Sequence, residues 1–289
     1  YIKNSKRPII LISSLKLITQ QMLKLNFNYK FNVIDKNLFK LSLIDNKKIN
    51  LINVDFNYRK PFDKISTKSN SYIEKCFNIA LDLMKKKNCV GLINGPISKK
   101  NFLNRKFLGI TEYLSNKTNK KNKVAMLIYN KKLSVSPITT HLPIKDVNKK
   151  ITKIKIINHI KLINDFYKKN NNKIPKIAIT GLNPHCESNY ISSEEDRIIS
   201  PAIKYLIKNK YKVEGPFPAD TIFIKSNLDK YDVIVGMYHD QVLTPMKALF
   251  GFDAINITLG LPFVRISPDH GPNSSMLGEN LSDPTSLIK

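Results

Sequence analysis

Gly236-Met-Tyr-His-Asp-Gln241 is the stretch of sequence that decides the fold of this chain. It comes directly after residues 231–235, a mostly apolar run with the length and β-branched composition of a buried strand. Polar and titratable side chains therefore gather where the chain leaves the predicted sheet. Because open α/β sheets bind their ligands at the carboxyl ends of strands, this stretch predicts an α/β fold with a chemical site at that edge.

Two further histidines follow strand-like segments in the same way as His239. His141 comes after the apolar run 133–138, and His185 comes after the run 177–180. Neutral imidazole is the commonest metal ligand, and histidine is a frequent general base near neutral pH. The three histidines together predict a metal or acid–base site built from the ends of three strands.

Strands and helices alternate along the chain, which indicates an α/β fold with a mixed sheet. Residues 66–87 are predicted to form an amphipathic helix, because apolar residues recur on one face at helical spacing. Ser192-Ser-Glu-Glu195 has the hydroxyls and carboxylates of a helix start, and that helix is expected to reach about residue 208. The other expected elements are strands at 8–13, 89–93 and 177–180, a hairpin of 124–129 with 133–138, a helix ending near 24, and a long helix at 147–169 that includes a structural His159.

The composition places the chain among intracellular globular proteins. Its 289 residues are enough for one large α/β domain or two closely joined lobes. The three cysteines lack metal-finger spacing, and neither a signal-peptide pattern nor a long apolar run is present, so we expect a reduced, cytoplasmic protein. There is no Gly-x-Gly-x-x-Gly opening a helix and no Walker-type loop, and hence no prediction of a Rossmann or P-loop nucleotide site.

The net charge of +26 raises the question of a polyanionic partner. Only five of the 48 basic residues are arginine, although proteins that read nucleic acid depend on arginine forks and interleaved aromatic rings. Lysine is instead spread along the whole chain, which indicates compositional drift on solvated faces. We therefore expect no specific nucleic-acid partner and no membrane partner. A non-catalytic remnant with nonspecific polyanion binding is the alternative that the charge leaves open.

Seven motifs occur in the order and spacing of one known family. Over nearly its whole length, the chain resembles the PdxA family of 4-hydroxythreonine-4-phosphate dehydrogenases, which act in vitamin B6 biosynthesis. The motifs are Asn94-Gly-Pro-Ile-Ser-Lys99, Gly109-Ile-Thr-Glu-Tyr113, Thr139-Thr-His-Leu-Pro143, Leu182-Asn-Pro-His185, Gly215-Pro-Phe-Pro-Ala-Asp-Thr221, Met237-Tyr-His-Asp-Gln241, and Leu261-Pro-Phe-Val-Arg265 followed by Asp269-His-Gly271.

The resemblance implies a two-lobed α/β/α architecture similar to isocitrate and isopropylmalate dehydrogenases, with the active site in the cleft between the lobes. Residues 1–289 would then form a single catalytic unit of two interwoven α/β lobes, working as a homodimer with the site shared across the interface. The implied reaction is an NAD-dependent, divalent-metal-dependent oxidation of 4-phosphooxy-L-threonine, with decarboxylation to 3-amino-2-oxopropyl phosphate. A sister enzyme acting on phosphorylated threonate or erythronate is the alternative within the family.

The resemblance also implies roles for individual residues. His141, His185 and His239 would hold one divalent metal ion per subunit, which is zinc, magnesium or cobalt. Three ligands with open coordination positions are typical of a catalytic metal site. The implied substrate contacts are Lys247, Asn256 and Arg265, of which Lys247 is also a candidate catalytic residue.

The residue types suggest further members of the site. Thr111, at a predicted helix start, is expected to offer its hydroxyl and backbone N–H to a phosphate. Arg265 has a guanidinium fork that suits a carboxylate or phosphate. Asp220 and Asp240 are candidate catalytic residues, either orienting a metal ligand or assisting proton transfer. The cofactor-binding candidates are Asp269, His270 and Gly271.

Several segments depart from the family pattern. Ile110 stands where the family has a substrate-binding histidine, and a glycine-poor segment that begins at Cys186 replaces a glycine-rich loop after His185. Residues 272–279 replace a glycine-rich, basic segment associated with the cofactor, so we expect weakened NAD binding. The phosphate hydrogen bond lost at Ile110 is expected to raise the KM for the substrate. The family's glycine-rich opening and closing helix are missing, and we expect a chain that has been trimmed or eroded at both ends.

Overall fold

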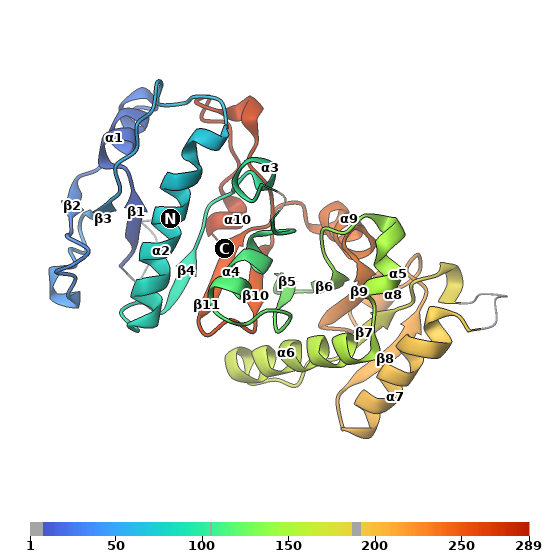
Figure 1. Cartoon of the computed structure of the whole chain (residues 1–289). Helices are drawn as coiled ribbons and strands as arrows, with labels where there is room; N and C mark the ends of the chain where they lie inside the picture. Colours follow the sequence, from blue (N-terminus) through green and yellow to red (C-terminus); the bar gives the residue numbers. More distant parts are fainter. Residues whose placement is uncertain (1–7, 105, 187–191, 289) are drawn as a thin grey trace.

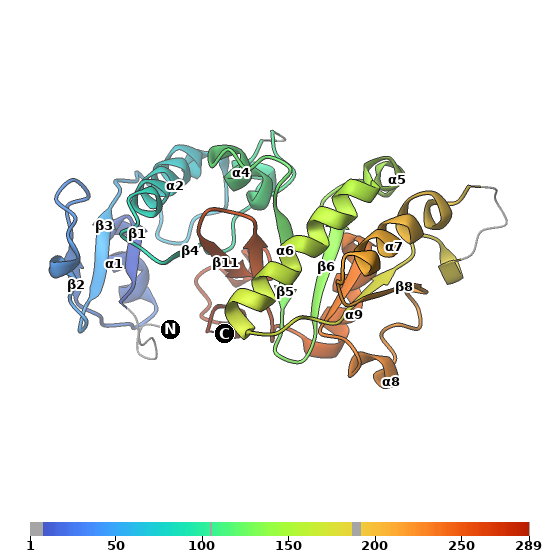
Figure 2. The ribbon, with the colours of Figure 1, turned by 90° about the horizontal axis from the view of Figure 1, so that it is seen from below.

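The computed structural model describes residues 8–104, 106–186 and 192–288 of the chain. It has an eight-stranded mixed sheet in the order β4-β11-β10-β5-β6-β9-β7-β8 and a smaller three-stranded sheet in the order β1-β3-β2 (Figure 1). The small sheet lies at one end of the molecule, and β8 lies at the other (Figures 1 and 2). The strands are β1 (Ile10–Ser13), β2 (Phe31–Val33), β3 (Ile49–Asn53), β4 (Gly91–Ile93), β5 (Ala125–Tyr129), β6 (Ser134–Thr139), β7 (Ile177–Thr180), β8 (Val213–Phe217), β9 (Val233–Tyr238), β10 (Ile255–Leu259) and β11 (Val264–Pro268).

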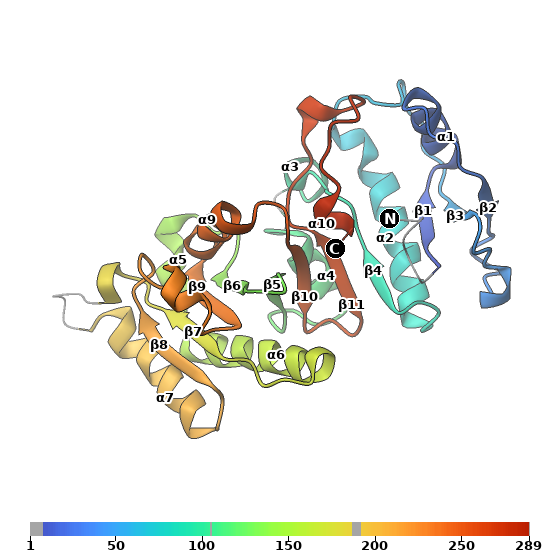
Figure 3. The same ribbon diagram turned by 180° about the vertical axis from the view of Figure 1, so that it is seen from behind.

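The α-helices connect these strands and cover both faces of the large sheet, which makes the fold an α/β fold as predicted. Helix α6 lies on one face of the sheet and α9 on the other, and in Figure 3 the two helices stand on opposite sides of β9. The helices are α1 (Leu15–Lys24), α2 (Asn70–Lys85), α3 (Lys99–Phe102), α4 (Ile110–Lys117), α5 (Val147–Lys150), α6 (Lys153–Asn171), α7 (Ser200–Lys208), α8 (Lys225–Leu228), α9 (His239–Phe250) and α10 (Thr285–Ile288).

Strand β9 shows how the sequence builds these layers. Successive side chains of a strand point to opposite faces of the sheet. Val233 and Val235 accordingly pack with the side chains of α6 and α7, whereas Ile234 packs with Val242 and Met246 of α9. Because both faces are covered, the strand is apolar throughout instead of alternating.

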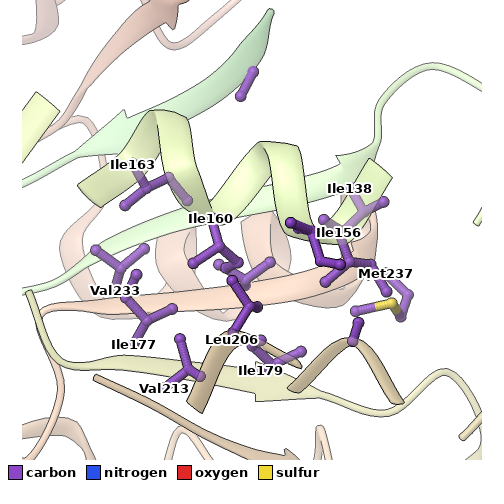
Figure 4. Close-up of a cluster of buried hydrophobic side chains, with 14 of the residues drawn as sticks. Ile138, Ile156, Ile160, Ile163, Ile177, Ile179, Leu206, Val213, Val233 and Met237 are labelled. Atoms are coloured by element: carbon purple, nitrogen blue, oxygen red, sulfur yellow. The ribbon is translucent and has the colours of Figure 1, made fainter. Parts of the chain in front are cut away.

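The largest apolar core lies between this sheet and helices α6 and α7 (Figure 4). Apolar side chains recur at helical spacing on α6 and pack against the parallel strands of the sheet. The fully buried members of this layer include Ile156, Ile160 and Ile163 of α6, Leu206 of α7, and Ile179 and Val233 of the sheet.

The strands β6, β9, β7 and β8 run parallel to one another. Their carboxyl ends therefore meet at a single edge of the sheet, and the segments that carry His141, His239 and His185 leave from three neighbouring strands. The predicted hairpin is also confirmed, since β5 pairs with β6 in antiparallel fashion with Ile128 opposite Val135.

The predicted helix over 147–169 is wrong as a single helix. The chain forms the short helix α5, becomes extended at Ile151, and starts again at α6. Thr152 caps the new helix, because its hydroxyl accepts a hydrogen bond from the backbone N–H of Lys155 at 3.2 Å. The break buries Ile151, which is 2% exposed.

The predicted helix start at 192–195 is confirmed, although the first turn is π-helical. Ser193 Oγ accepts a hydrogen bond from the backbone N–H of Asp196 at 3.2 Å. A π-helical turn at Glu195–Ile199 then precedes α7. In the ranges that the structure describes, none of the helices is both long enough and apolar enough to cross a membrane.

His159 of α6 is a core residue, as its place in the sequence predicted. Its side chain is 5% exposed, and its Nε2 lies 2.6 Å from Ser136 Oγ. Burial, followed by the charge of Lys155, lowers the pKa of His159 from 6.5 to about 3. The folded protein therefore keeps this imidazole neutral.

This buried histidine predicts a specific acid sensitivity. In the unfolded chain, His159 takes up a proton below about pH 6.5, but in the folded chain it does not. The free energy of unfolding should fall as pH decreases from about 6.5, by up to ~1.4 kcal/mol per pH unit from this group. Urea denaturation at about pH 7 and about pH 5 measures the slope. A His159→Gln variant should lose less stability than wild type over this interval, and equal slopes would contradict the prediction.

Candidate active site

The three predicted histidines all lie at the carboxyl edge of the parallel strands. His141 is in the loop after β6, and His239 is the first residue of α9, immediately after β9. Their ring centroids are 5.3 Å apart, so the two imidazoles lie side by side. His185 follows β7 in a short 3-10 turn, Pro184–Cys186, and has a left-handed φ of 56°.

His141 lies in a partly dehydrated position. Its Nε2 is 2.5 Å from Lys99 Nζ, and its Nδ1 is buried without a hydrogen-bond partner among the described residues. Burial, followed by the positive charge of Lys99 and the neighbouring His239, lowers the pKa of His141 from 6.5 to about 4. Its imidazole is therefore neutral near neutral pH, which is the form that binds metal ions.

The other two histidines each have a carboxylate neighbour. His239 Nδ1 lies 2.6 Å from Asp240 Oδ1, and His185 Nδ1 lies 3.9 Å from Asp220 Oδ2. Both predicted aspartates are thus placed beside predicted metal ligands. Within the part of the chain that the structure describes, no three His, Cys, Asp or Glu residues of one subunit are arranged to hold a metal ion.

A second cluster joins two of the predicted substrate residues through Thr258 of β10. Arg265 of β11 donates from Nη1 to Thr258 Oγ1 and from Nε to Asn94 Oδ1, each at 2.9 Å. Thr111 Oγ1 lies 3.3 Å from the same Thr258 hydroxyl. Arg265 is 2% exposed, and this burial lowers its pKa to about 10, an effect that the Glu112 charge partly offsets.

Glu112 links this buried cluster to the histidines. Its Oε1 accepts a hydrogen bond from Thr140 Oγ1 at 3.0 Å, next to His141, while its Oε2 is buried without a hydrogen-bond partner among the described residues. Desolvation lowers the pKa of Lys99, the Glu112 charge raises it, and the Arg265 charge lowers it further. The charged groups of Lys99, Arg265 and Glu112 are therefore close enough to interact electrostatically. They connect the imidazoles to the cluster around Thr258.

Gly109 allows these groups to come together. A Cβ atom at this position would lie 2.8 Å from Glu112 Oε2 and 3.1 Å from His141 Nδ1. The neighbouring Ile110 points elsewhere, since it is 7% exposed and belongs to an apolar cluster with Phe77 and Leu114. A histidine substituted at position 110 in this conformation would be buried in that apolar cluster, and not beside the histidines of the sheet edge.

Lys247 lies two turns beyond His239 on α9 and forms an ion pair with Asp269, whose side chain is only 1% exposed. Asp269 Oδ1 also accepts a hydrogen bond from Ser286 Oγ at 3.1 Å. The Lys247 ammonium lies 4.6 Å from the centroid of the Phe252 ring. Two residues that the sequence placed in different roles, substrate contact and cofactor contact, are thus direct partners.

The remaining predicted residues lie around these clusters. Asn256 of β10 has a buried Oδ1 without a hydrogen-bond partner among the described residues, which is uncommon for a buried amide oxygen. The His270 ring packs edge-on against Phe252 with centroids 5.4 Å apart. Gly271 is exposed, and a Cβ there would meet no atom within 4 Å, so the structure places no steric demand on this glycine.

Sequence reasoning missed three members of the site: Lys99, Glu112 and Thr258. Lys99 and Glu112 stand inside the motifs 94–99 and 109–113, where they are the charged residues of otherwise uncharged segments. That feature could have identified them. Thr258 has no such signal, because it is one hydroxyl in an apolar strand.

The family described as pyridoxal phosphate biosynthetic protein PdxA matches residues 4–289 of the chain. A Sulfurihydrogenibium protein named 4-hydroxythreonine-4-phosphate dehydrogenase is 42% identical over 245 residues, which is 83% of this chain and 74% of that protein. A Neisseria meningitidis serogroup A protein of the same name is 39% identical over 200 residues, 68% of this chain and 59% of its own length. A Salmonella typhi protein provisionally named D-threonate 4-phosphate dehydrogenase is 32% identical over 72% of this chain and 64% of its own.

Solved structures give the same result. The crystal structure of 4-hydroxythreonine-4-phosphate dehydrogenase from Klebsiella pneumoniae superposes with a TM-score of 0.80 and 26% identity, covering 98% of this chain and 88% of that one. Isocitrate dehydrogenase from Methylococcus capsulatus shares the fold alone, with a TM-score of 0.52 and 7% identity over 98% of this chain and 83% of its own. The predicted likeness to isocitrate dehydrogenases is therefore confirmed, and the chain belongs to the PdxA family of dehydrogenases.

Proposed function

We propose that this protein oxidises 4-phosphooxy-L-threonine with NAD in a divalent-metal-dependent reaction and releases 3-amino-2-oxopropyl phosphate and carbon dioxide, within vitamin B6 biosynthesis. The observation that carries the proposal is the placement of two neighbouring imidazoles close to a cluster of charged residues that includes the buried Arg265. His141 and His239 are linked to Arg265 through Lys99 and Glu112. An oxidation of a phosphorylated hydroxy acid needs both a centre for the reacting oxygen and a site for anions.

The donor chemistry of His141, His185 and His239 fits a divalent transition-metal ion. Imidazole nitrogen suits zinc or cobalt, whereas magnesium prefers oxygen ligands, so we favour zinc or cobalt. Because the described residues of one subunit do not gather three metal donors around a point, we propose that the site is completed at a homodimer interface. A bound ion would act as a Lewis acid toward the substrate hydroxyl and carbonyl oxygens.

The residues around the imidazoles would orient them. With its proton on Nδ1, His239 would donate a hydrogen bond to Asp240, and its Nε2 would be left free to bind a metal ion. Asp220 stands in the corresponding position beside His185. Both aspartates are exposed, and either could exchange protons with solvent during turnover.

The proposed binding site for the substrate anions is the cluster of Arg265, Thr258 and Thr111. Arg265 is held in place by Asn94 and Thr258, and its fork suits a phosphate or carboxylate. Thr111 lies in the first turn of α4, where helix N–H groups also favour an anion. Asn256 offers an unpaired amide oxygen that can accept a hydrogen bond from the substrate amino group.

NAD would accept the hydride, and the candidate contacts Asp269, His270 and Gly271 differ in their exposure. The Asp269 carboxylate is buried and paired with Lys247, so it fits contact with a cofactor poorly. His270 is half-buried and Gly271 is exposed, and these two residues are the proposed contacts. Lys247 is the proposed general acid–base, and its ion pair with Asp269 fixes where its ammonium lies.

Steady-state kinetics on two substrates test the proposed specificity. If Asn256 accepts a hydrogen bond from the amino group, kcat/KM for 4-phosphooxy-L-threonine should exceed that for 4-phospho-D-threonate by at least about tenfold, since a buried hydrogen bond contributes ~1.5 kcal/mol. An Asn256→Leu variant should lose much of this preference. A preference for the threonate would instead favour the sister activity, which the name of the Salmonella typhi relative supports.

A further inference from the structure

The side chain of Gln241 connects two strand ends at the proposed metal site. Gln241 lies in the first turn of α9, two residues after His239. Its Oε1 accepts hydrogen bonds from the backbone N–H of Met237 at 2.6 Å and from Thr180 Oγ1 at 3.0 Å. Its Nε2 donates to the carbonyl oxygen of Gly181 at 2.8 Å. One side chain thus fastens the end of β9 to the end of β7.

The segment that leads to His185 is held from its other side by Glu195. Glu195 Oε1 accepts hydrogen bonds from the backbone N–H groups of Leu182 at 2.7 Å and Asn183 at 2.9 Å, and Oε2 accepts one from Asn183 Nδ2 at 2.8 Å. Glu195 is 2% exposed. Between β7 and the turn of His185, Gln241 therefore binds the backbone of Gly181, and Glu195 binds the next two residues.

Two glycines make this close approach sterically feasible. A Cβ at Gly236 would lie 2.9 Å from Gln241 Oε1, and a Cβ at Gly181 would lie 2.9 Å from Glu195 Oε1. Both distances are shorter than real Cβ contacts. The backbone at each strand end can thus accept the Gln241 and Glu195 side chains only because no side chain stands there.

We propose that Gln241 is a positioning residue, which fixes the end of β7 against the start of α9 and thereby sets the affinity of His185 and His239 for a divalent cation. The inference rests on the proposed metal site. Outer partners that orient metal ligands typically change metal affinity about ten- to hundredfold when they are lost. Gln241 binds the backbone of the two strand ends that lead to His239 and His185. Its loss should therefore displace two of the three proposed ligands.

The Gln241→Glu variant isolates this role. The carboxylate is nearly isosteric and can still accept from Met237 and Thr180, but it cannot donate to the Gly181 carbonyl. Zinc affinity of the full-length protein, measured by competition with a chromophoric chelator, should fall about ten- to hundredfold. Gln21→Glu is the matched control, because Gln21 Nε2 also donates to a backbone carbonyl, that of Pro61 at 2.7 Å, far along the chain from the histidines. Its zinc affinity should equal that of wild type.

The outcomes separate this inference from the proposed function. Zinc binding by Gln241→Glu within about twofold of wild type would overturn the positioning role while leaving the metal site intact. A wild-type protein that binds no zinc would overturn the metal site itself and the inference with it. Gln241→Asn, whose shorter amide cannot span both strand ends, should also weaken zinc binding and provides the test should the glutamate variant not fold. Circular dichroism confirms that each variant compared is folded.

Discussion

Replacing Lys247 with alanine is expected to reduce turnover of 4-phosphooxy-L-threonine by about two to four orders of magnitude, the usual contribution of a general acid–base residue. The structure adds a second effect. Asp269, with a side chain only 1% exposed, would lose its cation partner. Leaving a buried carboxylate unpaired lowers the free energy of unfolding, by ~3 kcal/mol for a pair in which the lysine stays partly solvated.

A double variant separates these two effects. Asp269→Asn in the Lys247→Ala background removes the unpaired charge, so the free energy of unfolding should recover while turnover stays low. Urea denaturation and initial rates of NADH formation give the two readouts. Turnover that is unchanged in Lys247→Ala would mean that the site has been placed wrongly. Turnover that returns in the double variant would assign Lys247 a purely structural role.

Replacing His239 with alanine is expected to remove most of the bound metal. Wild type should retain about one divalent ion per subunit after mild dialysis, because three imidazoles form a site of ordinary catalytic type. Loss of one ligand should lower affinity by more than the ten- to hundredfold that loss of an outer partner causes. Elemental analysis of the dialysed proteins measures the content directly.

His270→Ala is the matched control for this experiment, since it also removes an imidazole that reaches the surface, but one that packs on Phe252 and lies outside the proposed ligands. Its metal content should match wild type. Equal metal content in wild type and His239→Ala would rule out His239 as a ligand. A monomeric form that retained full metal would contradict the shared-interface part of the proposal.

The strands that carry the histidines could be predicted from the sequence because each is a short apolar run that ends in polar residues. The order β6-β9-β7 could not, since it depends on pairing between strands that are far apart in the sequence, as Ser134 with Val233 and Ile177 with Val233 are. That order is what brings His141 and His239 to 5.3 Å. The resemblance to the PdxA family supplied the same grouping without the geometry.

Contacts between side chains that are distant in the sequence could not be predicted either. Lys247 and Asp269 were assigned to substrate and cofactor separately, and only the fold shows that α9 and the end of β11 bring them together. At Ile110, the motif and the structure suggest different roles. Its motif suggested a lost contact to the substrate phosphate, whereas its side chain is a member of an apolar cluster, and its β-branched shape fits that role.

The helix break before α6 has a local cause that sequence periodicity hides. Residues 147–169 keep an apolar face at helical spacing, but the backbone is extended at Ile151, whose side chain is buried in the core. Thr152 then supplies the cap that a new helix needs. Tertiary burial outweighed local propensity here, as it commonly does.

NADH formation from 4-phosphooxy-L-threonine tests most directly whether this chain is a working dehydrogenase of phosphorylated hydroxythreonine. The assay contains full-length protein, saturating substrate, NAD, and added zinc or cobalt. We predict metal-dependent NADH formation with a raised KM, accompanied by release of one carbon dioxide per NADH. Absence of NADH under these conditions, from a folded protein that binds the metal, would mean that the histidines at the sheet edge survive without the activity.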